Sequence, residues 1–255
     1  MHVRIIVCSD AHLDWRTAGV ERFDEIRESF EQAVDYAINE GRQADLFVFC
    51  GDLCDSDDGR DVLRASAYAV DVAVRLMNEG ITSLWIAGNH DIVGDGDTTT
   101  LTPLEGLEFA DRTSALVLVA SKGPRRDVLA FSGDARDVML VSLPYSPKEY
   151  DADAYLRNDA ATGFAGLPRL VFAHLMLPGM HPGSESGELQ RGKDRMFPID
   201  AMKTTKPALV VNGHYHRAQT TPDGIRIPGS LARLTFGEEG HDPGFLVIDD
   251  EKGFR

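Results

Sequence analysis

The chain has 255 residues, of which 43% are hydrophobic and 26% are charged, as is typical of a soluble globular protein. This length is enough for one large α/β domain with a sizeable core. The formal net charge of −15 disfavours non-specific binding to nucleic acid, which depends on basic surface. Two bound divalent cations would reverse the sign of the potential locally, so the acidic net charge weakens a nucleic-acid function without excluding it.

The three cysteines indicate a reducing compartment. Cys8 and Cys50 end apolar runs and Cys54 follows soon after, so an odd set of buried thiols is expected rather than a disulfide framework. The first apolar run, residues 3–8, is too short for a signal peptide or a membrane span, and no other run reaches membrane length. We therefore expect a cytoplasmic protein without a membrane segment.

The first apolar run predicts a buried strand that leads directly into polar residues. Residues 3–8 are short and β-branched, and Asp10 and His12 follow two positions apart. An amphipathic helix is then predicted over residues 21–40, ended by Gly41. Asp and His are common at strand ends, so this pair alone is a weak signal.

A second buried strand is predicted over residues 45–50, and Gly51 and Asp52 follow it. The order strand, helix, strand implies a right-handed βαβ unit whose parallel strands end at the same edge of the sheet. Asp52 is therefore expected to converge with Asp10 and His12. Taken alone, Gly51 and Asp52 are equally compatible with a turn and a helix N-cap.

The third unit repeats this pattern with a richer set of side chains. A helix is predicted over residues 61–80 and a strand over residues 81–87, followed by Gly88 and then by Asn89, His90 and Asp91. Open α/β folds place their ligands at this edge of the sheet. A Gly-Asn turn with a capping Asp is the structural alternative.

The second half of the chain has the shorter periodicity of strands. Residues 116–120, 127–131 and 137–143 are predicted to form strands of the second sheet of a sandwich, and residues 148–160 a short acidic helix. Another buried strand, residues 170–173, ends at His174. A lone histidine at this point would more often be a hydrogen-bonded core residue than a ligand.

The last third combines a basic loop with a pair of histidines. Positive charge gathers within residues 178–197, as Arg191, Lys193 and Arg195, which suggests either a phosphate-contacting loop or a solvated one. The predicted strand 208–212 is followed by Gly213, His214, Tyr215 and His216. Closing strands are predicted after residue 225. No linker is evident, so we expect a single domain over residues 1–255.

The side chains that follow strands form a set suited to metal ions. Five of the eight histidines lie just after apolar runs, and they join two aspartates and one asparagine: His12, His90, His174, His214, His216, Asp10, Asp52 and Asn89. Oxygen and imidazole donors without thiolate favour a pair of divalent transition metals. Mn²⁺ is our first choice and Fe²⁺ the second, ahead of Zn²⁺ and Mg²⁺.

This ordered series resembles the motifs of the calcineurin-like metallophosphoesterase superfamily. All five motifs occur in order between residues 10 and 216, and although each is weak alone, the ordered set is very specific. With the element pattern, the resemblance implies an α/β fold: a four-layer αββα sandwich of two mixed β-sheets flanked by helices.

The resemblance also implies roles for individual residues. One metal would be held by Asp10, His12 and His216, the other by Asn89, His174 and His214, and Asp52 would bridge the two. The ions would lie roughly 3.5–4 Å apart and supply an activated hydroxide. His90 would contact the phosphate or protonate the leaving oxygen, and Asp91 would orient His90. Asp55 stands where Mre-type relatives have His, so the resemblance assigns it no role.

Some segments are similar to those of one subgroup, the SbcD and Mre-type DNA-repair nucleases. They are Ala173-His174-Leu175, Ser184-Glu185-Ser186, and residues 213–219 and 227–233. The subgroup match is looser than the superfamily match. Those nucleases usually continue into a DNA-capping domain and an ATPase-binding region, and no separate capping domain is apparent before Arg255.

We therefore expect a metal-dependent phosphodiester hydrolase acting on DNA, as an exonuclease or endonuclease. Expected partners are DNA, an SMC-like ATPase subunit, and a second copy of the chain docked through the helix at residues 61–80 or its neighbour. One alternative is a phosphodiesterase or phosphatase acting on a small nucleotide or a phosphoprotein. Another is a non-catalytic scaffold, which would be expected to have lost ligands.

Overall fold

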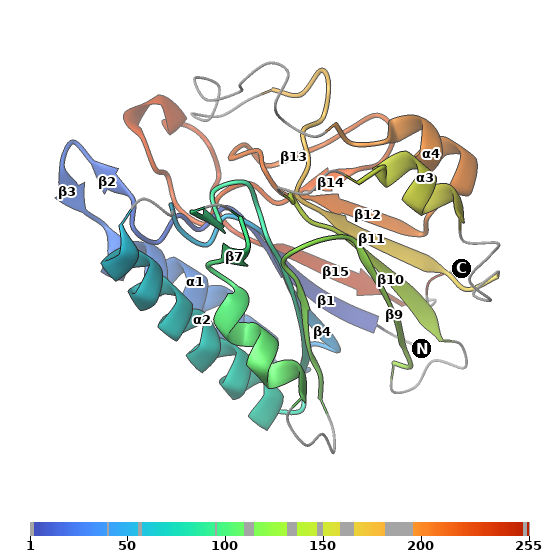
Figure 1. Cartoon of the computed structure of the whole chain (residues 1–255), viewed down its shortest axis with the longest axis horizontal. Coiled ribbons are helices and arrows are strands. Elements are labelled where there is room, and N and C mark those ends of the chain that lie inside the picture. Colours follow the sequence, from blue (N-terminus) through green and yellow to red (C-terminus); the bar gives the residue numbers. More distant parts are fainter. Residues whose placement is uncertain are drawn as a thin grey trace.

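The computed structural model describes residues 3–39, 41–55, 58–94, 96–109, 115–131, 137–146, 150–158, 166–181, 196–251 and 254. Two mixed β-sheets lie face to face, with α1 and α2 on one outer side and α3 and α4 on the other (Figure 1). The expected four-layer αββα sandwich is therefore confirmed.

The first sheet has a parallel centre with one antiparallel edge. Its order is β15-β1-β4-β5-β8, in which β1, β4, β5 and β8 run parallel and β15 pairs antiparallel with β1. The strands are β1 (Val3–Cys8), β4 (Leu46–Cys50), β5 (Thr82–Ile86), β8 (Val117–Ala120) and β15 (Leu246–Asp250). The parallel strands β1, β4 and β5 therefore deliver their following loops to one edge.

The second sheet also has a parallel centre. Its order is β13-β14-β12-β11-β10-β9, with β10, β11, β12 and β14 parallel and an antiparallel strand at each side. The strands are β9 (Arg125–Leu129), β10 (Val138–Leu143), β11 (Arg169–Ala173), β12 (Leu209–Asn212), β13 (Gln219–Thr220) and β14 (Arg226–Ile227).

Helices and small hairpins complete the described elements. The α-helices are α1 (Phe23–Asn39), α2 (Gly59–Asn78), α3 (Ala152–Arg157) and α4 (Ile199–Thr205), and the 3₁₀ helices are η1 (Thr102–Phe109) and η4 (Phe236–Glu238). The hairpins are β2 (Arg16–Thr17) with β3 (Val20–Glu21), and β6 (Ile92–Val93) with β7 (Thr98–Thr99). Among the described helices, none combines the length and the apolar character that a membrane span requires.

Strand residues alternate between two buried faces, which explains the unbroken apolar runs. In β1, Ile6 and Cys8 pack toward α1 and α2, whereas Ile5 and Val7 pack between the sheets. In β11, Phe172 faces the space between the sheets. A parallel strand covered on both sides needs apolar residues at every position.

Residues 116–120 were expected in the second sheet, and this expectation is wrong. The strand β8 instead lies parallel to β5 at the edge of the first sheet, with Ser83 opposite Val117. All four residues of β8 are buried, so both of its faces are apolar. This pattern marks a covered strand but does not identify the sheet that receives it.

The cysteines are free and buried, as expected. Burial raises the pKa of the Cys8 thiol, and the charge of Asp10 adds to that effect. The thiols are therefore kept protonated, which makes them poor metal ligands.

Truncating a side chain between the sheets tests this packing. Phe172 is fully buried, so Phe172→Ala should lower the free energy of unfolding by about 3–5 kcal/mol. Val128→Ala, at a position that is 37% exposed on β9, should change it by less than about 0.5 kcal/mol. Denaturant unfolding of the two variants measures the contrast, and equal losses would contradict the assigned core.

Candidate metal centre

The backbone at the strand ends is held in a conformation that most residues avoid. Within the described ranges, six residues other than glycine have a positive φ, and four belong to the expected site: Asp10 (52°), His12 (43°), Asp52 (60°) and His214 (78°). Such conformations cost about 1–3 kcal/mol each and persist only where the surroundings enforce them. They turn these side chains out of the strand direction and toward one another.

Glycines allow the loops to meet. A Cβ on Gly88 would lie 2.0 Å from Oδ1 of Asp52, and one on Gly51 would lie 2.2 Å from Nδ1 of His174. Gly51 also has a φ of 93°, which L side chains rarely adopt. Any larger residue at either position would therefore displace a site side chain.

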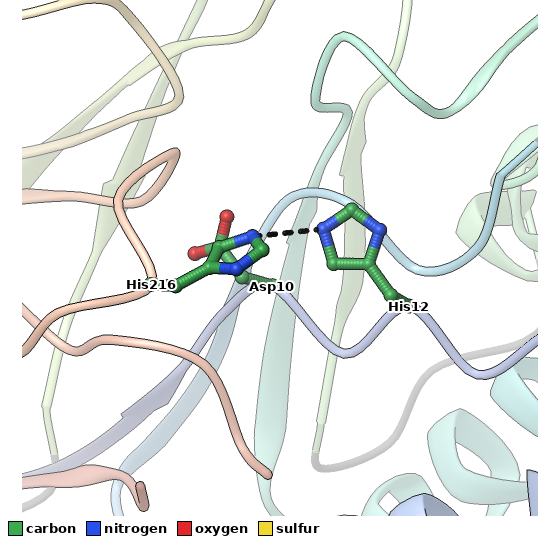
Figure 2. Close-up of side chains that lie close together, drawn as sticks. All are labelled: Asp10, His12 and His216. Carbon is green, nitrogen blue, oxygen red and sulfur yellow. Dashed lines mark hydrogen bonds between the residues drawn. The ribbon is translucent and has the colours of Figure 1, made fainter. Parts of the chain in front are cut away.

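The first group of side chains consists of Asp10, His12 and His216. One ligand atom from each lies within 4.8 Å of the others. Figure 2 shows the two imidazole rings pointing toward each other, with Nε2 of His216 3.2 Å from Nε2 of His12. The loops after β1 and β12, which belong to different sheets, therefore meet here.

The second group consists of Asp52, His174 and His214, again with ligand atoms within 4.8 Å. Asn89 lies among them, because its Oδ1 is 3.2 Å from Nε2 of His174 and 3.0 Å from Nδ1 of His214. The other ring nitrogen of His174, Nδ1, is 2.6 Å from the carbonyl oxygen of Cys50. A ring held by a backbone carbonyl in this way presents its second nitrogen in a fixed direction.

Asp52 lies between the two groups. Its Oδ2 is 3.1 Å from Nε2 of His174 and 3.7 Å from Nε2 of His12. Its Oδ1 accepts a hydrogen bond of 2.9 Å from the backbone N–H of His90. A single carboxylate thus faces side chains from both sheets.

Several polar atoms at this site are buried without a protein partner. Among the described side chains, Oδ1 of Asp10 and Nε2 of His214 are buried and make no hydrogen bond. Buried polar groups are normally satisfied, so these atoms indicate room for a ligand. Imidazole nitrogens and carboxylate or amide oxygens are suitable donors for divalent transition metals, so the Asp/His clusters fit a dinuclear metal site.

The pKa shifts of the metal-free site depend on burial and on the charges of neighbouring side chains, and the carboxylates raise the pKa of the His174 ring to about 9 against the effect of its burial. Burial raises the pKa of the Asp10 carboxyl, and the charge on Asp52 raises it further. Burial opposes ionisation of Asp52, yet the charges on His174 and His90 hold its pKa well below the usual value. Burial lowers the pKa of His214 to about 3, so this ring is neutral, as a metal ligand must be.

His90 lies at the rim of the site and is only partly buried. Its Nδ1 contacts Oδ1 of Asp55, and its ring centroid is 4.9 Å from that of His12. The contact with Asp55 orients the ring and leaves Nε2 as the second functional atom. Asp55, to which the sequence assigned no role, is thus the carboxylate beside His90.

Asp91 was expected to orient His90, and that role stays a prediction; the described contacts of its carboxylate are to the backbone of neighbouring loops and to Thr100. The carboxylate oxygens accept hydrogen bonds from the backbone N–H groups of Asp52, Leu53 and Gly88 at 2.8–2.9 Å, and from the hydroxyl of Thr100. A carboxylate has about four acceptor positions, and these four donors fill them. The Asp91 carboxylate therefore links the loop after β4 to the loop after β5 through hydrogen bonds.

The expected site residues differ in how completely they are described. The seven predicted metal ligands and His90 come together at one edge of the two sheets. The residues of the basic loop, Arg191, Lys193 and Arg195, lie outside the described residues.

The sequence analysis missed Glu238, whose Oε1 is 2.9 Å from Nδ1 of His216. No local signal distinguishes it from its neighbour Glu239.

Replacing Asp91 by Asn tests its structural role. The amide keeps one acceptor oxygen, so about two of the four donors would face an NH₂ group, each at a cost of about 1–3 kcal/mol. Asp91→Asn should therefore lower the unfolding free energy of metal-free protein, as measured by denaturant unfolding. Asp71→Asn, which removes the same charge from an exposed position on α2, should leave it nearly unchanged. Loss of activity at unchanged stability would instead point to a catalytic role for Asp91.

Comparison with known proteins agrees with the fold and identifies the family. A crystal structure of TT1561 from Thermus thermophilus is similar with a TM-score of 0.57 at 16% identity, covering 91% of each chain. GAP50, titled the anchor in the inner membrane complex of Plasmodium, has a TM-score of 0.53 at 13% identity, covering 97% of this chain and 81% of its own. At these identities the likeness concerns the fold alone. The family model for calcineurin-like phosphoesterase matches residues 3–218, and the chain therefore belongs to that family.

Proposed function

We propose that this protein is a DNA-cleaving phosphodiesterase of SbcD or Mre type that works with two divalent ions, with Mn²⁺ favoured. Family membership supports metal-dependent phosphoester hydrolysis as the reaction class. The observation that carries the proposal is the convergence of a full oxygen and imidazole donor set around Asp52. A non-catalytic scaffold would be expected to have lost some of these ligands.

The proposed ligand assignment follows the two groups. Asp10, His12 and His216 would hold one ion, Asn89, His174 and His214 the other, and Asp52 would contact both. Two such ions would stabilise charge on the phosphoryl oxygens and acidify a water molecule. The protein holds its donors rigidly for this task, because backbone contacts and burial fix their directions.

His90 is the proposed proton donor to the leaving oxygen. With Nδ1 held by Asp55, the ring would transfer the proton on Nε2 to the departing alkoxide. Burial opposes ionisation of Asp55, but contacts with His12 and His90 hold its pKa below the usual value, so this carboxylate stays charged. A charged carboxylate beside the ring stabilises the protonated form that donation requires.

The choice of DNA rests on the segments that resemble the SbcD and Mre-type nucleases. Against it stands the net charge of −15, which gives little general attraction to a polyanion. The cations Arg191, Lys193 and Arg195, which cluster in the sequence, are the candidates for the local positive charge that a phosphate backbone would need. Small phosphodiesters are the second candidate substrate class, since they need only the metal centre. GAP50, an anchor by its title, has this fold, so a scaffold is the third candidate.

Hydrolysis by metal-stripped protein resupplied with Mn²⁺ or Mg²⁺ tests the proposal. The substrates are end-labelled single-stranded DNA, duplex DNA and bis-(p-nitrophenyl) phosphate. We expect Mn²⁺-dependent cleavage of DNA, and we expect His90→Ala to slow it by roughly 10²–10⁴-fold through loss of the proton donor. His181→Ala, at an exposed histidine outside the two groups, is the matched control and should keep full activity.

The substrates separate the candidate functions. Cleavage of the small diester with both DNAs intact would replace the nuclease proposal by a small-molecule phosphodiesterase. No hydrolysis of any substrate despite bound metal would favour a scaffold.

The basic loop gives a second test. If Arg191, Lys193 and Arg195 contact phosphates, replacing all three by Gln should flatten the dependence of DNA cleavage on salt concentration. Hydrolysis of the small diester should be unaffected, because that substrate has no extended backbone. Initial rates between low and moderate salt measure the slope. An unchanged slope would show that DNA binding, where present, depends on other groups.

A further inference from the structure

We infer that Glu238 is a positioning residue for the metal centre: it binds the Nδ1 proton of His216 and thereby turns the Nε2 lone pair toward the ion. This inference rests on the proposed function, in which His216 is a ligand. It assigns a role to a carboxylate that lies outside the segment matched by the family model, residues 3–218.

The contacts of Glu238 are the basis for the inferred tautomer of His216. Oε2 of Glu238 accepts a bond of 2.6 Å from the backbone N–H of Leu234, a group that can only donate. Oε1 lies 2.9 Å from Nδ1 of His216. In the arrangement we infer, Glu238 is ionised and only accepts hydrogen bonds, so Nδ1 of His216 carries the proton.

The opposite nitrogen then faces the first group. Nε2 of His216 is 3.2 Å from Nε2 of His12, and each of these rings has a nitrogen within 4.8 Å of a carboxylate oxygen of Asp10. Metal-bound histidines commonly donate their second N–H to a carboxylate, which fixes the tautomer and makes the ring more basic. Glu238 occupies the place of that carboxylate.

Glu238 is held in place by a segment that is tied to the His216 loop. The backbone N–H of Ser230 donates to the carbonyl of His216 at 3.1 Å, and a Cβ on Gly229 would lie 2.9 Å from that same oxygen. Gly229 also has a φ of 81°. This close approach leads the chain into η4, where Glu238 is 1% exposed while its neighbour Glu239 is exposed.

Glu238→Gln leaves the side chain nearly the same shape but with only one hydrogen-bond acceptor oxygen. The amide has one acceptor oxygen for two donors, so either Leu234 N–H or His216 Nδ1–H must face an NH₂ group. If the amide donates to His216, the ring takes the other tautomer, and its proton then occupies the nitrogen that should bind metal. Glu239→Gln, one residue away and exposed, is the matched control.

Mn²⁺ titration of metal-stripped protein by calorimetry provides the first readout. For one of the two ions, Glu238→Gln should weaken binding by roughly 10–100-fold, whereas Glu239→Gln should bind like the unaltered protein. Unchanged affinity in Glu238→Gln, or an equal loss in both variants, would overturn the inference.

The tautomer of His216 in the unaltered, metal-free protein provides the second readout. Histidine ¹⁵N–¹H correlation spectra, assigned with His216→Asn, should show the proton on Nδ1. A proton on Nε2 would overturn the inference, and this measurement decides it even if Glu238→Gln does not fold. Failure of the unaltered protein to bind Mn²⁺ would instead refute the proposed function.

Discussion

The site depends on the cost of burying negative charge. Asp10, Asp52 and Asp91 are almost completely removed from water where the two sheets meet. A buried carboxylate is tolerated only when donors or positive charge surround it. Asp91 receives four hydrogen bonds, and Asp52 receives one backbone donor and the His174 ring. Asp10 keeps one oxygen without a protein donor, and this imbalance is what a divalent cation would correct.

The left-handed backbone conformations at the strand ends cost free energy, and the packing of the sandwich offsets this cost. Left-handed conformations at Asp10, His12, Asp52 and His214 are unfavourable for these residue types. Backbone bonds tie the first two loops together, since N–H groups of Ala11 and His12 both donate to the carbonyl of Asp52. The strands beneath are apolar on both faces and anchor the loops to the core. Rigid sheets thus permit strained loops.

Around the ligands lies a second set of carboxylates that contact imidazole rings, and Asp55 lies near both His90 and His12. Asp55 contacts His90 and Glu238 contacts His216, and each carboxylate comes from a different part of the chain from its partner. In both pairs the carboxylate contacts Nδ1, so Nε2 remains for chemistry. A carboxylate contact to Nδ1 therefore occurs both at His90, at the rim of the site, and at His216, within the first group.

Local sequence was enough to specify the strands, the long helices and the side chains that leave each strand end, because apolar period and turn residues act over a few positions. It also identified the family, through five ordered motifs that each lie within a few residues. It did not determine that β8 joins the first sheet, since burial on both faces does not specify a neighbour. The partners of Asp91, Asp55 and Glu238 likewise emerge only in the assembled fold. Which donor a carboxylate meets depends on loops that are distant in sequence, and no local pattern encodes that meeting.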